Sequence, residues 1–298
     1  MPGRQANVYL KCVAPRPPIF IPYRRAAAQG VCSTSYKLMT LTLALAQIDI
    51  RLGDKAANLA RARTLIADAA RRHVDLVIFP ELWTTGYDLA HASQLAEPIP
   101  QGPTARQLAA WAQEFGLWVT GSFLEKTSAG IYNAAPFFGP QGEALPPYRK
   151  IHRFGPMDED RWLEAGCRPG LFDLPWGKTG VAICYDLRFP ELFRRYAAAG
   201  AGLILLPSEW PHPRLAHWRT LVQARAIENQ CFVAAVNRVG RDQNNAFCGH
   251  SMLVDPWGDI LTEAGEEEAL LIATIDLALT EAVRARIPVL ADRRPECY

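Results

Sequence analysis

Short apolar segments alternate with amphipathic ones along most of this chain, and no other feature limits the possible fold as strongly. Residues 41–50 and 75–82 are apolar and β-rich, and the segment between them carries apolar side chains at helical spacing. The same order returns over residues 177–239. Strands that alternate with helices predict an α/β layered fold. Strands joined by short polar turns, at residues 131–148 and 249–275, favour mixed rather than purely parallel sheets.

The chain divides into an unusual N-terminal segment and one long domain. No linker or internal repeat interrupts residues 39–278, so we expect residues 39–298 to form a single domain. The segment 1–38 has six basic residues and no acidic one, and prolines break any period. We interpret it as an N-terminal extension that is disordered or translated from a non-native start, with a targeting segment or an ordered arm as alternatives. The polar tail, residues 279–298, is expected on a surface or at a dimer interface.

Composition excludes several classes of protein. No apolar run is long enough to span a membrane, so we expect no membrane partner. Without the six basic residues of the first segment, 26 basic and 30 acidic residues remain, which gives no basis for nucleic-acid binding. The seven cysteines form no CxxC pair and the six histidines show no ligand spacing, so neither a metal nor another cofactor is expected. Sparse cysteines also favour a cytoplasmic location.

Three residues stand where a catalytic group would be useful. Cys184 follows the apolar segment GVAI, at a turn before a predicted helix, where nucleophiles of α/β enzymes are often placed. Glu81 ends the segment DLVIFPE and would suit a general base. Lys150, in YRKIH, could stabilise an oxyanion. From spacing alone each has a plain structural alternative: a small core cysteine, a helix cap or surface carboxylate, and a solvated lysine.

The segments FPELW, YRKIH and CYDLRFPEL, in this order, resemble the carbon–nitrogen hydrolase (nitrilase) superfamily. The resemblance covers about residues 40–298, and five shorter segments match as well: GSF, YNAA, ARAIENQ, NRVG and GHS. It implies a four-layer α-β-β-α sandwich and a homodimer or higher homo-oligomer, with the C-terminal tail crossing to the partner. It also implies a Glu81–Lys150–Cys184 triad and a second glutamate, Glu159 in EDRWLEAG, with Asp158 and Asp160 as neighbouring alternatives.

Within the superfamily, the segments FPELWTTGYD, SEWPHPR and RIPVLADRRPECY are most similar to bacterial omega-amidase-like proteins. This resemblance implies hydrolysis of the terminal amide of a small 2-oxo acid, such as 2-oxoglutaramate, to the acid and ammonia. Glu81 would take the proton of Cys184 as sulfur attacks the amide carbonyl, and a thioester would form and be hydrolysed. Lys150 and the backbone N–H of Tyr185 would hold the oxyanion, while Glu159 would order Lys150 or the substrate amide.

Further side chains are expected around the site. We expect five of them to bind substrate: Ser208, Glu209 and Trp210 at the mouth of the pocket, and Trp83 and Tyr87, together with Trp210, where they would set substrate size. Two pairs are interpreted as structural ion pairs: Arg188 with Glu191, and Arg225 with Glu228. The sequence does not identify the group that binds the substrate carboxylate.

Two other functions remain open at this point. One is an N-carbamoyl amino acid or amide hydrolase with the same triad, which would release carbon dioxide as well as ammonia. The other is a non-catalytic binding protein of the same fold. A papain-like cysteine–histidine pair is a further alternative for the nucleophile, although nothing around Cys184 matches such a family.

Overall fold

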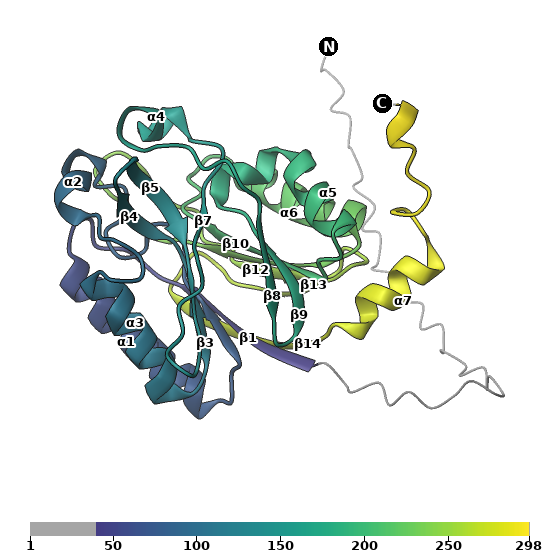
Figure 1. The fold of residues 1–298 in the computed structure, drawn as a ribbon, viewed down its shortest axis with the longest axis horizontal. Helices are drawn as coiled ribbons and strands as arrows, with labels where there is room; N and C mark the ends of the chain where they lie inside the picture. Colours follow the sequence, from purple (N-terminus) through teal and green to yellow (C-terminus); the bar gives the residue numbers. More distant parts are fainter. Residues whose placement is uncertain (1–39, 298) are drawn as a thin grey trace, which may run out of the picture. The chain divides into compact units, whose positions relative to one another are not determined.

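Two mixed β-sheets stack against each other at the centre of the computed structural model, which describes residues 40–297 (Figure 1). The expectations for residues 1–38 lie outside this range. The first sheet has the strand order β14–β1–β2–β3–β6, and its three middle strands are parallel. Its strands are β1 (Thr40–Gln47), β2 (Leu76–Ile78), β3 (Trp118–Thr120), β6 (Phe137–Phe138) and β14 (Ala269–Asp276).

The second sheet has the order β13–β12–β11–β10–β9–β8, with β9, β10 and β11 parallel. Its strands are β8 (Gly170–Leu174), β9 (Gly177–Val181), β10 (Leu203–Ser208), β11 (Phe232–Asn237), β12 (Met252–Val254) and β13 (Ile260–Glu263). A smaller sheet consists of β4 (Phe123–Thr127), β5 (Gly130–Ala135) and β7 (Tyr148–Arg149).

Helices cover the outer face of each large sheet. Along β1 the side chains alternate, so that Leu43 and Leu45 join the core shared with the second sheet, whereas Ala44 and Ala46 pack toward α1 (Lys55–Arg71) and α3 (Pro103–Phe115). On the second sheet, α5 (Pro190–Ala198) and α6 (Leu215–Asn229) contribute the matching apolar side chains. Figure 1 shows these helix pairs on opposite sides of the two sheets. The expected four-layer α-β-β-α sandwich is therefore confirmed.

The remaining helices are short, apart from α7 near the C-terminus. They are the 3-10 turns η1 (Leu89–His91), η2 (Gly155–Met157), η3 (Cys184–Arg188) and η4 (Pro295–Cys297), and the helices α2 (Ala92–Leu95), α4 (Glu159–Trp162) and α7 (Ala278–Arg286). Within residues 40–297 no helix has the length and apolar character needed to cross a membrane. The carboxyl ends of parallel strands are where ligands bind in α/β folds, and here β2, β9 and β10 each lead directly into a loop that carries a polar or thiol side chain.

Candidate active site

Four side chains that are distant in the sequence meet in one buried cluster: Glu81, Lys150, Glu159 and Cys184. Lys150 Nζ lies 2.7 Å from Glu81 Oε1 and 2.7 Å from Glu159 Oε2, and the side chains of all three are at most 1% exposed. The Cys184 thiol is buried beside them, close enough for the charges of Glu81, Lys150 and Glu159 all to act on its pKa. The geometry thus brings the three residues of the expected triad together and selects Glu159, since Asp158 and Asp160 are exposed.

The backbone explains how these side chains arrive at one place. Glu81 stands three residues beyond β2, and Lys150 directly follows β7, where its N–H donates to the carbonyl of Asn133 at 2.9 Å. Cys184 begins the η3 turn after β9 with a φ of +45°, in the left-handed region that side-chain-bearing residues seldom adopt. Such strain is typical of a nucleophile that a sharp turn between strand and helix presents to substrate.

The two oxygens of Glu81 have different surroundings. Oε1 accepts hydrogen bonds from Lys150, from the Tyr87 hydroxyl at 2.8 Å and from Asn133 Nδ2 at 2.8 Å. Within residues 40–297, Oε2 accepts one hydrogen bond, from the backbone N–H of Glu209 at 2.9 Å. Since a carboxylate oxygen has about two lone-pair sites, Oε2 is the oxygen with capacity left to take a proton.

Burial and neighbouring charges set the protonation states of the cluster. Burial, followed by the charge of Glu81, raises the pKa of Cys184 well above its ordinary value of 9.0, so the thiol is protonated at neutral pH and needs a base to become a nucleophile. Burial opposes the charge on Lys150, but Glu159 and Glu81 outweigh it and raise the pKa of Lys150, which keeps its positive charge. Burial likewise raises the pKa of Glu159, against the effect of Lys150.

Tyr87 and Asn133 belong to this cluster, and sequence reasoning assigned neither to it. The Tyr87 hydroxyl, which we expected to set substrate size, lies 3.2 Å from Glu159 Oε1 in addition to its bond with Glu81. Asn133 Nδ2 donates to both glutamates, at 2.8 Å and 3.1 Å. The available signal was the polar Asn133 within the otherwise apolar strand IYNAA, because a buried amide requires hydrogen-bond partners.

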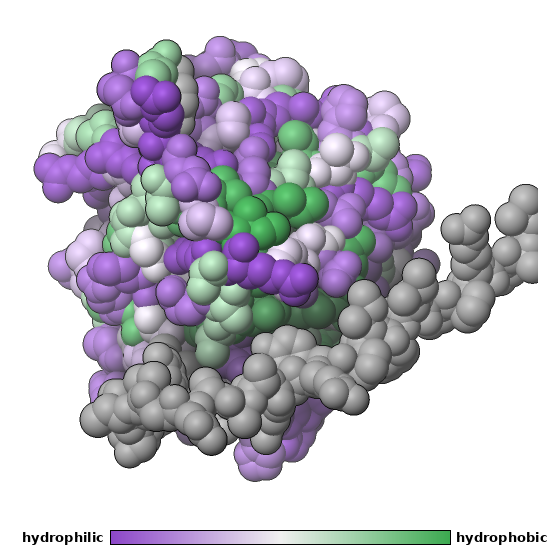
Figure 2. All heavy atoms as spheres, turned by 90° about the vertical axis from the view of Figure 1, so that its right-hand side faces the viewer, coloured by the Kyte–Doolittle hydropathy of each residue, from purple (hydrophilic) through white to green (hydrophobic). Residues whose placement is uncertain are grey.

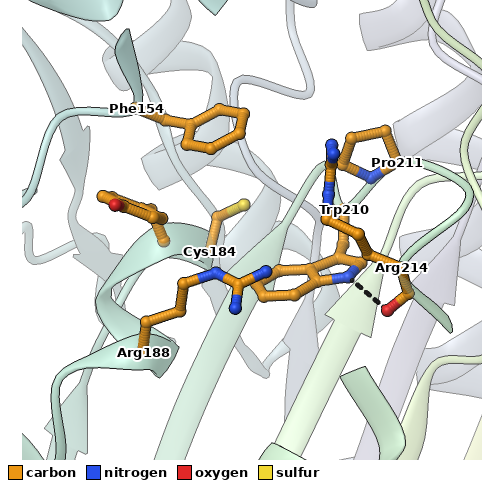
Figure 3. A pocket seen from close by; sticks show the side chains of 7 residues that line it. Phe154, Cys184, Arg188, Trp210, Pro211 and Arg214 are labelled. Carbon is orange, nitrogen blue, oxygen red and sulfur yellow. Dashed lines mark hydrogen bonds between the residues drawn. The ribbon is translucent and has the colours of Figure 1, made fainter. Parts of the chain in front are cut away.

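A small pocket opens directly at Cys184 (Figure 3). It is lined by Phe154, Cys184, Tyr185, Arg188, Trp210, Pro211 and Arg214. Figure 3 shows the Cys184 sulfur turned toward the space that the other side chains surround. The Arg188 guanidinium lies over the Trp210 ring, 4.8 Å from its centroid, and Arg214 lies over Phe154 at 5.8 Å. Trp210 Nε1 also donates to the Arg214 carbonyl at 3.0 Å.

The pocket corrects several expectations. Of the five residues expected to bind substrate, Trp210 is the one that lines this pocket. Trp83 is buried and stacks on Phe79, with 4.5 Å between ring centroids. Ser208 and Glu209 are fully buried: Ser208 ends β10, where it pairs with Asn237 of β11, and the Glu209 carboxyl pairs with Arg238 at 2.8 Å.

The two ion pairs expected near the site have different outcomes. Arg225 and Glu228 form the expected pair at 2.8 Å. Within the described residues Arg188 forms no such pair with Glu191; its guanidinium faces the pocket instead. In the same part of the chain, no group of three or more His, Cys, Asp or Glu side chains is arranged to hold a metal ion.

Comparison with known proteins places this site in a family. The family model described as "Carbon-nitrogen hydrolase" matches residues 42–285. The 2-oxoglutaramate amidase of Bacillus subtilis is 42% identical over 87% of this chain and 100% of its own length. Omega-amidase NIT2 of Mus musculus is 36% identical, over 88% of this chain and 98% of its own.

A solved structure agrees with these sequence relatives. The CN-hydrolase superfamily protein XC1258 of Xanthomonas campestris, which has an arsenic adduct in its active site, superposes with a TM-score of 0.80 at 34% identity, covering 86% of this chain and 97% of that one. The matches extend over the segments that carry Glu81, Lys150 and Cys184. This chain belongs to the carbon–nitrogen hydrolase family.

Proposed function

We propose that this chain is an amidase that hydrolyses the terminal amide of a small 2-oxo acid, such as 2-oxoglutaramate, to the carboxylic acid and ammonia. The observation that carries the proposal is the pair of arginines, Arg188 and Arg214, in the same pocket as the Cys184 thiol. A 2-oxo acid with a terminal amide has its carboxylate at the end opposite the reactive carbonyl. Arginine is well suited to bind that carboxylate, because its planar guanidinium can form two parallel hydrogen bonds.

Acylation begins at the buried thiol. Glu81 accepts the proton of Cys184 on Oε2, and the sulfur attacks the amide carbonyl carbon. The resulting oxyanion is stabilised by Lys150 and by the backbone N–H of Tyr185. Two of the three ammonium donors of Lys150 are directed at glutamates, and the third has only a long contact of 3.4 Å with Tyr87, so it can turn to the oxyanion. Such donors contribute about 100- to 1,000-fold each to the rate.

Glu81 then changes from base to acid. It returns the proton to the departing nitrogen, the C–N bond breaks, and ammonia leaves a thioester on Cys184. A water molecule gives a proton to Glu81 and attacks the thioester carbonyl, which releases the acid and restores the thiol. Glu159 transfers no proton: it holds Lys150 Nζ at 2.7 Å and accepts the backbone N–H of Phe154 at 2.6 Å.

Ammonia release from matched substrates tests this function. We expect wild-type protein to hydrolyse 2-oxoglutaramate faster than an N-carbamoyl amino acid or a neutral amide of similar length, and Cys184→Ala to release no ammonia. In Arg188→Met and Arg214→Met, KM for 2-oxoglutaramate should rise about 10-fold or more, as for a lost charge-assisted contact, with little change for the neutral amide. Equal effects on both amides would contradict a carboxylate site. Faster release of ammonia and carbon dioxide from the carbamoyl compound would favour the alternative hydrolase.

We also propose that residues 39–298 act as one domain in a cytoplasmic homodimer, with the tail 279–298 at the interface. Figure 2 shows hydrophobic side chains gathered on the face that lies at the right of Figure 1. Large apolar side chains that are 38–52% exposed support this interface: Ile227, Trp257, Ile260, Leu261 and Ile287. The five free cysteines of the described residues suit a reducing compartment. Light scattering should find a dimer that Ile227→Lys weakens.

A further inference from the structure

We propose that Glu209 and Arg238 are positioning residues for Glu81: together they fix the backbone N–H that holds the proton-accepting oxygen of the base. The inference rests on the role of Glu81 as base in the proposed function, but not on the identity of the substrate. Oε2 of Glu81 has the Glu209 N–H as its hydrogen-bond donor, at 2.9 Å, whereas Oε1 has three donors. The direction of this one N–H therefore sets where the free lone pair of Oε2 points.

The backbone around Glu209 is held on both sides by the end of β11. The N–H of Arg238 donates to the Ser208 carbonyl at 3.1 Å, and Asn237 Oδ1 accepts the N–H of Trp210 at 2.6 Å. These two contacts leave the peptide of Glu209 between two fixed neighbours. Its side chain supplies the third point of attachment, since Glu209 Oε2 accepts from Arg238 Nη1 at 2.8 Å.

Arg238 in turn connects this loop to the first sheet. Its Nη2 donates to the carbonyl of Ile50, just beyond β1, at 2.8 Å, and its guanidinium lies over the Phe247 ring, 4.2 Å from the centroid. Asp242 and Asp49 lie 3.5 Å and 3.7 Å from it. The guanidinium is thus fixed from several directions. Through Arg238, Glu209 is connected to the first sheet, which contains β1 and β2, and Glu81 follows β2 in that same sheet.

Stability alone does not account for this pair. Both side chains are 0% exposed, and Glu209 Oε1 and Arg238 Nε have no hydrogen-bond partner among the described residues. A buried ion pair can often be replaced by well-packed apolar side chains of similar volume with little loss of stability. Burial, partly opposed by Arg238, raises the pKa of Glu209 to about 8. Glutamine has nearly the same shape as this carboxyl and keeps an oxygen that can accept from Arg238. What an apolar pair could not supply is the fixed direction of the Glu209 peptide.

The test compares Glu209→Gln, Glu209→Ala and Arg238→Lys with wild type and with a remote control, Glu97→Gln, which removes the pair with Lys55. The first readout is alkylation of Cys184 by iodoacetamide, followed on its peptide by mass spectrometry. In that reaction a sulfur–carbon bond forms, iodide leaves and the thiol proton passes to Glu81, so no C–N bond is broken and no 2-oxo acid is involved. The second readout is kcat and KM for 2-oxoglutaramate.

We expect Glu209→Ala and Arg238→Lys to lose about 10- to 100-fold in alkylation rate and in kcat, as for a misplaced catalytic group, with KM within about twofold of wild type. Lysine fails because one ammonium cannot replace the two-pronged contact to Glu209 and Ile50. Glu209→Gln, which keeps an acceptor for Arg238, should remain within about threefold. The control should match wild type.

Folded Glu209→Ala or Arg238→Lys protein that alkylates at the wild-type rate overturns the inference, and so does Glu209→Gln if it is no better than Glu209→Ala. If Glu209→Ala does not fold, Arg238→Lys and Glu209→Gln decide. If wild type is alkylated rapidly but releases no ammonia from 2-oxoglutaramate, the proposed substrate fails, and the alkylation rates still decide the role of Glu209.

Discussion

Lys150 Nζ donates to Glu81 Oε1 over 2.7 Å in a part of the protein where neither side chain is more than 1% exposed. The same ammonium also forms an ion pair with Glu159 at 2.7 Å, so a single positive charge stabilises two buried carboxylates. Burial of an unpaired ion is strongly unfavourable, and therefore this one lysine makes the charged form of the whole cluster possible.

Removing that cation should reduce both activity and stability. For Lys150→Met we expect a loss of about 3–5 kcal/mol in the free energy of unfolding, because two glutamates remain buried without their partner. The deficit should shrink as the pH is lowered and carboxyl groups become protonated. Ammonia release should fall by about 100-fold or more. Urea unfolding at several pH values measures the first effect.

An exposed lysine is the matched control. Lys178 pairs with Asp173 at 2.7 Å, but their side chains are 42% and 81% exposed. Lys178→Met should therefore change the free energy of unfolding by less than about 1 kcal/mol. A Lys150→Met protein as stable as Lys178→Met would contradict the view that the buried lysine supports both glutamates.

The raised pKa of Cys184 predicts a specific loss of stability at alkaline pH. Below about pH 9 the thiol is protonated in both the folded and the unfolded chain, so it adds no pH dependence. Above the ordinary value of 9.0 the unfolded thiol ionises while the folded one does not, and unfolding is favoured by roughly 1.4 kcal/mol per pH unit. Cys184→Ala has no thiol at this position, so it should not show this loss of stability. The difference in free energy of unfolding between the two proteins should be constant below about pH 9. Above that pH, wild type should lose stability relative to Cys184→Ala.

Asp186 joins the lysine segment to the nucleophile turn, and its loss should affect both. Its fully buried carboxylate accepts the N–H of Ile183 at 2.8 Å, the Tyr148 hydroxyl at 2.7 Å, and the N–H and ring Nδ1 of His152 at 3.1 and 2.7 Å. Asparagine has one acceptor oxygen and an NH2 group, so at least one of these N–H or O–H donors would face the NH2 group of the new side chain, which is itself a donor. Asp186→Asn should lose about 1–3 kcal/mol in the free energy of unfolding.

Measurements of activity distinguish a role of Asp186 in positioning Cys184 from a purely structural role. Asp186 holds the turn in which Cys184 adopts its positive φ, so kcat for ammonia release should fall in Asp186→Asn. Tyr148→Phe removes one of the four donors and is the comparison. If both variants lose stability equally and keep wild-type kcat, Asp186 does not position the nucleophile.

The layers and the ends of strands could be predicted from the sequence, because both depend on local pattern. Side chains along residues 40–47 point alternately to the helical layer and to the second sheet. Glu81 and Cys184 each follow a short apolar strand that is evident in the sequence. The resemblance to a family then supplied Glu159, and it favoured a catalytic Lys150 over the solvated lysine that spacing alone leaves open.

What the sequence could not supply was the direction of side chains in loops. Arg188 comes four residues after Cys184 and three before Glu191, whose carboxylate makes an ion pair look sufficient, yet it turns toward Trp210. Glu209 follows a strand just as Glu81 does, but it points into the interior toward Arg238. These directions depend on partners more than 20 residues away, so no local period encodes them.

The stacking of Arg188 on Trp210 yields the last prediction. Trp210→Leu removes the ring beneath the guanidinium, and a contact of this kind contributes about 0.5–2 kcal/mol. Arg188 would remain charged but would no longer be held in one orientation. KM for 2-oxoglutaramate should therefore rise about 2- to 30-fold, with a smaller change for a neutral amide of similar length. Steady-state ammonia release on both substrates checks this, with Trp257→Leu, an exposed tryptophan outside the pocket, as the control. An equal rise in KM for both amides would mean that Trp210 shapes the pocket without orienting Arg188.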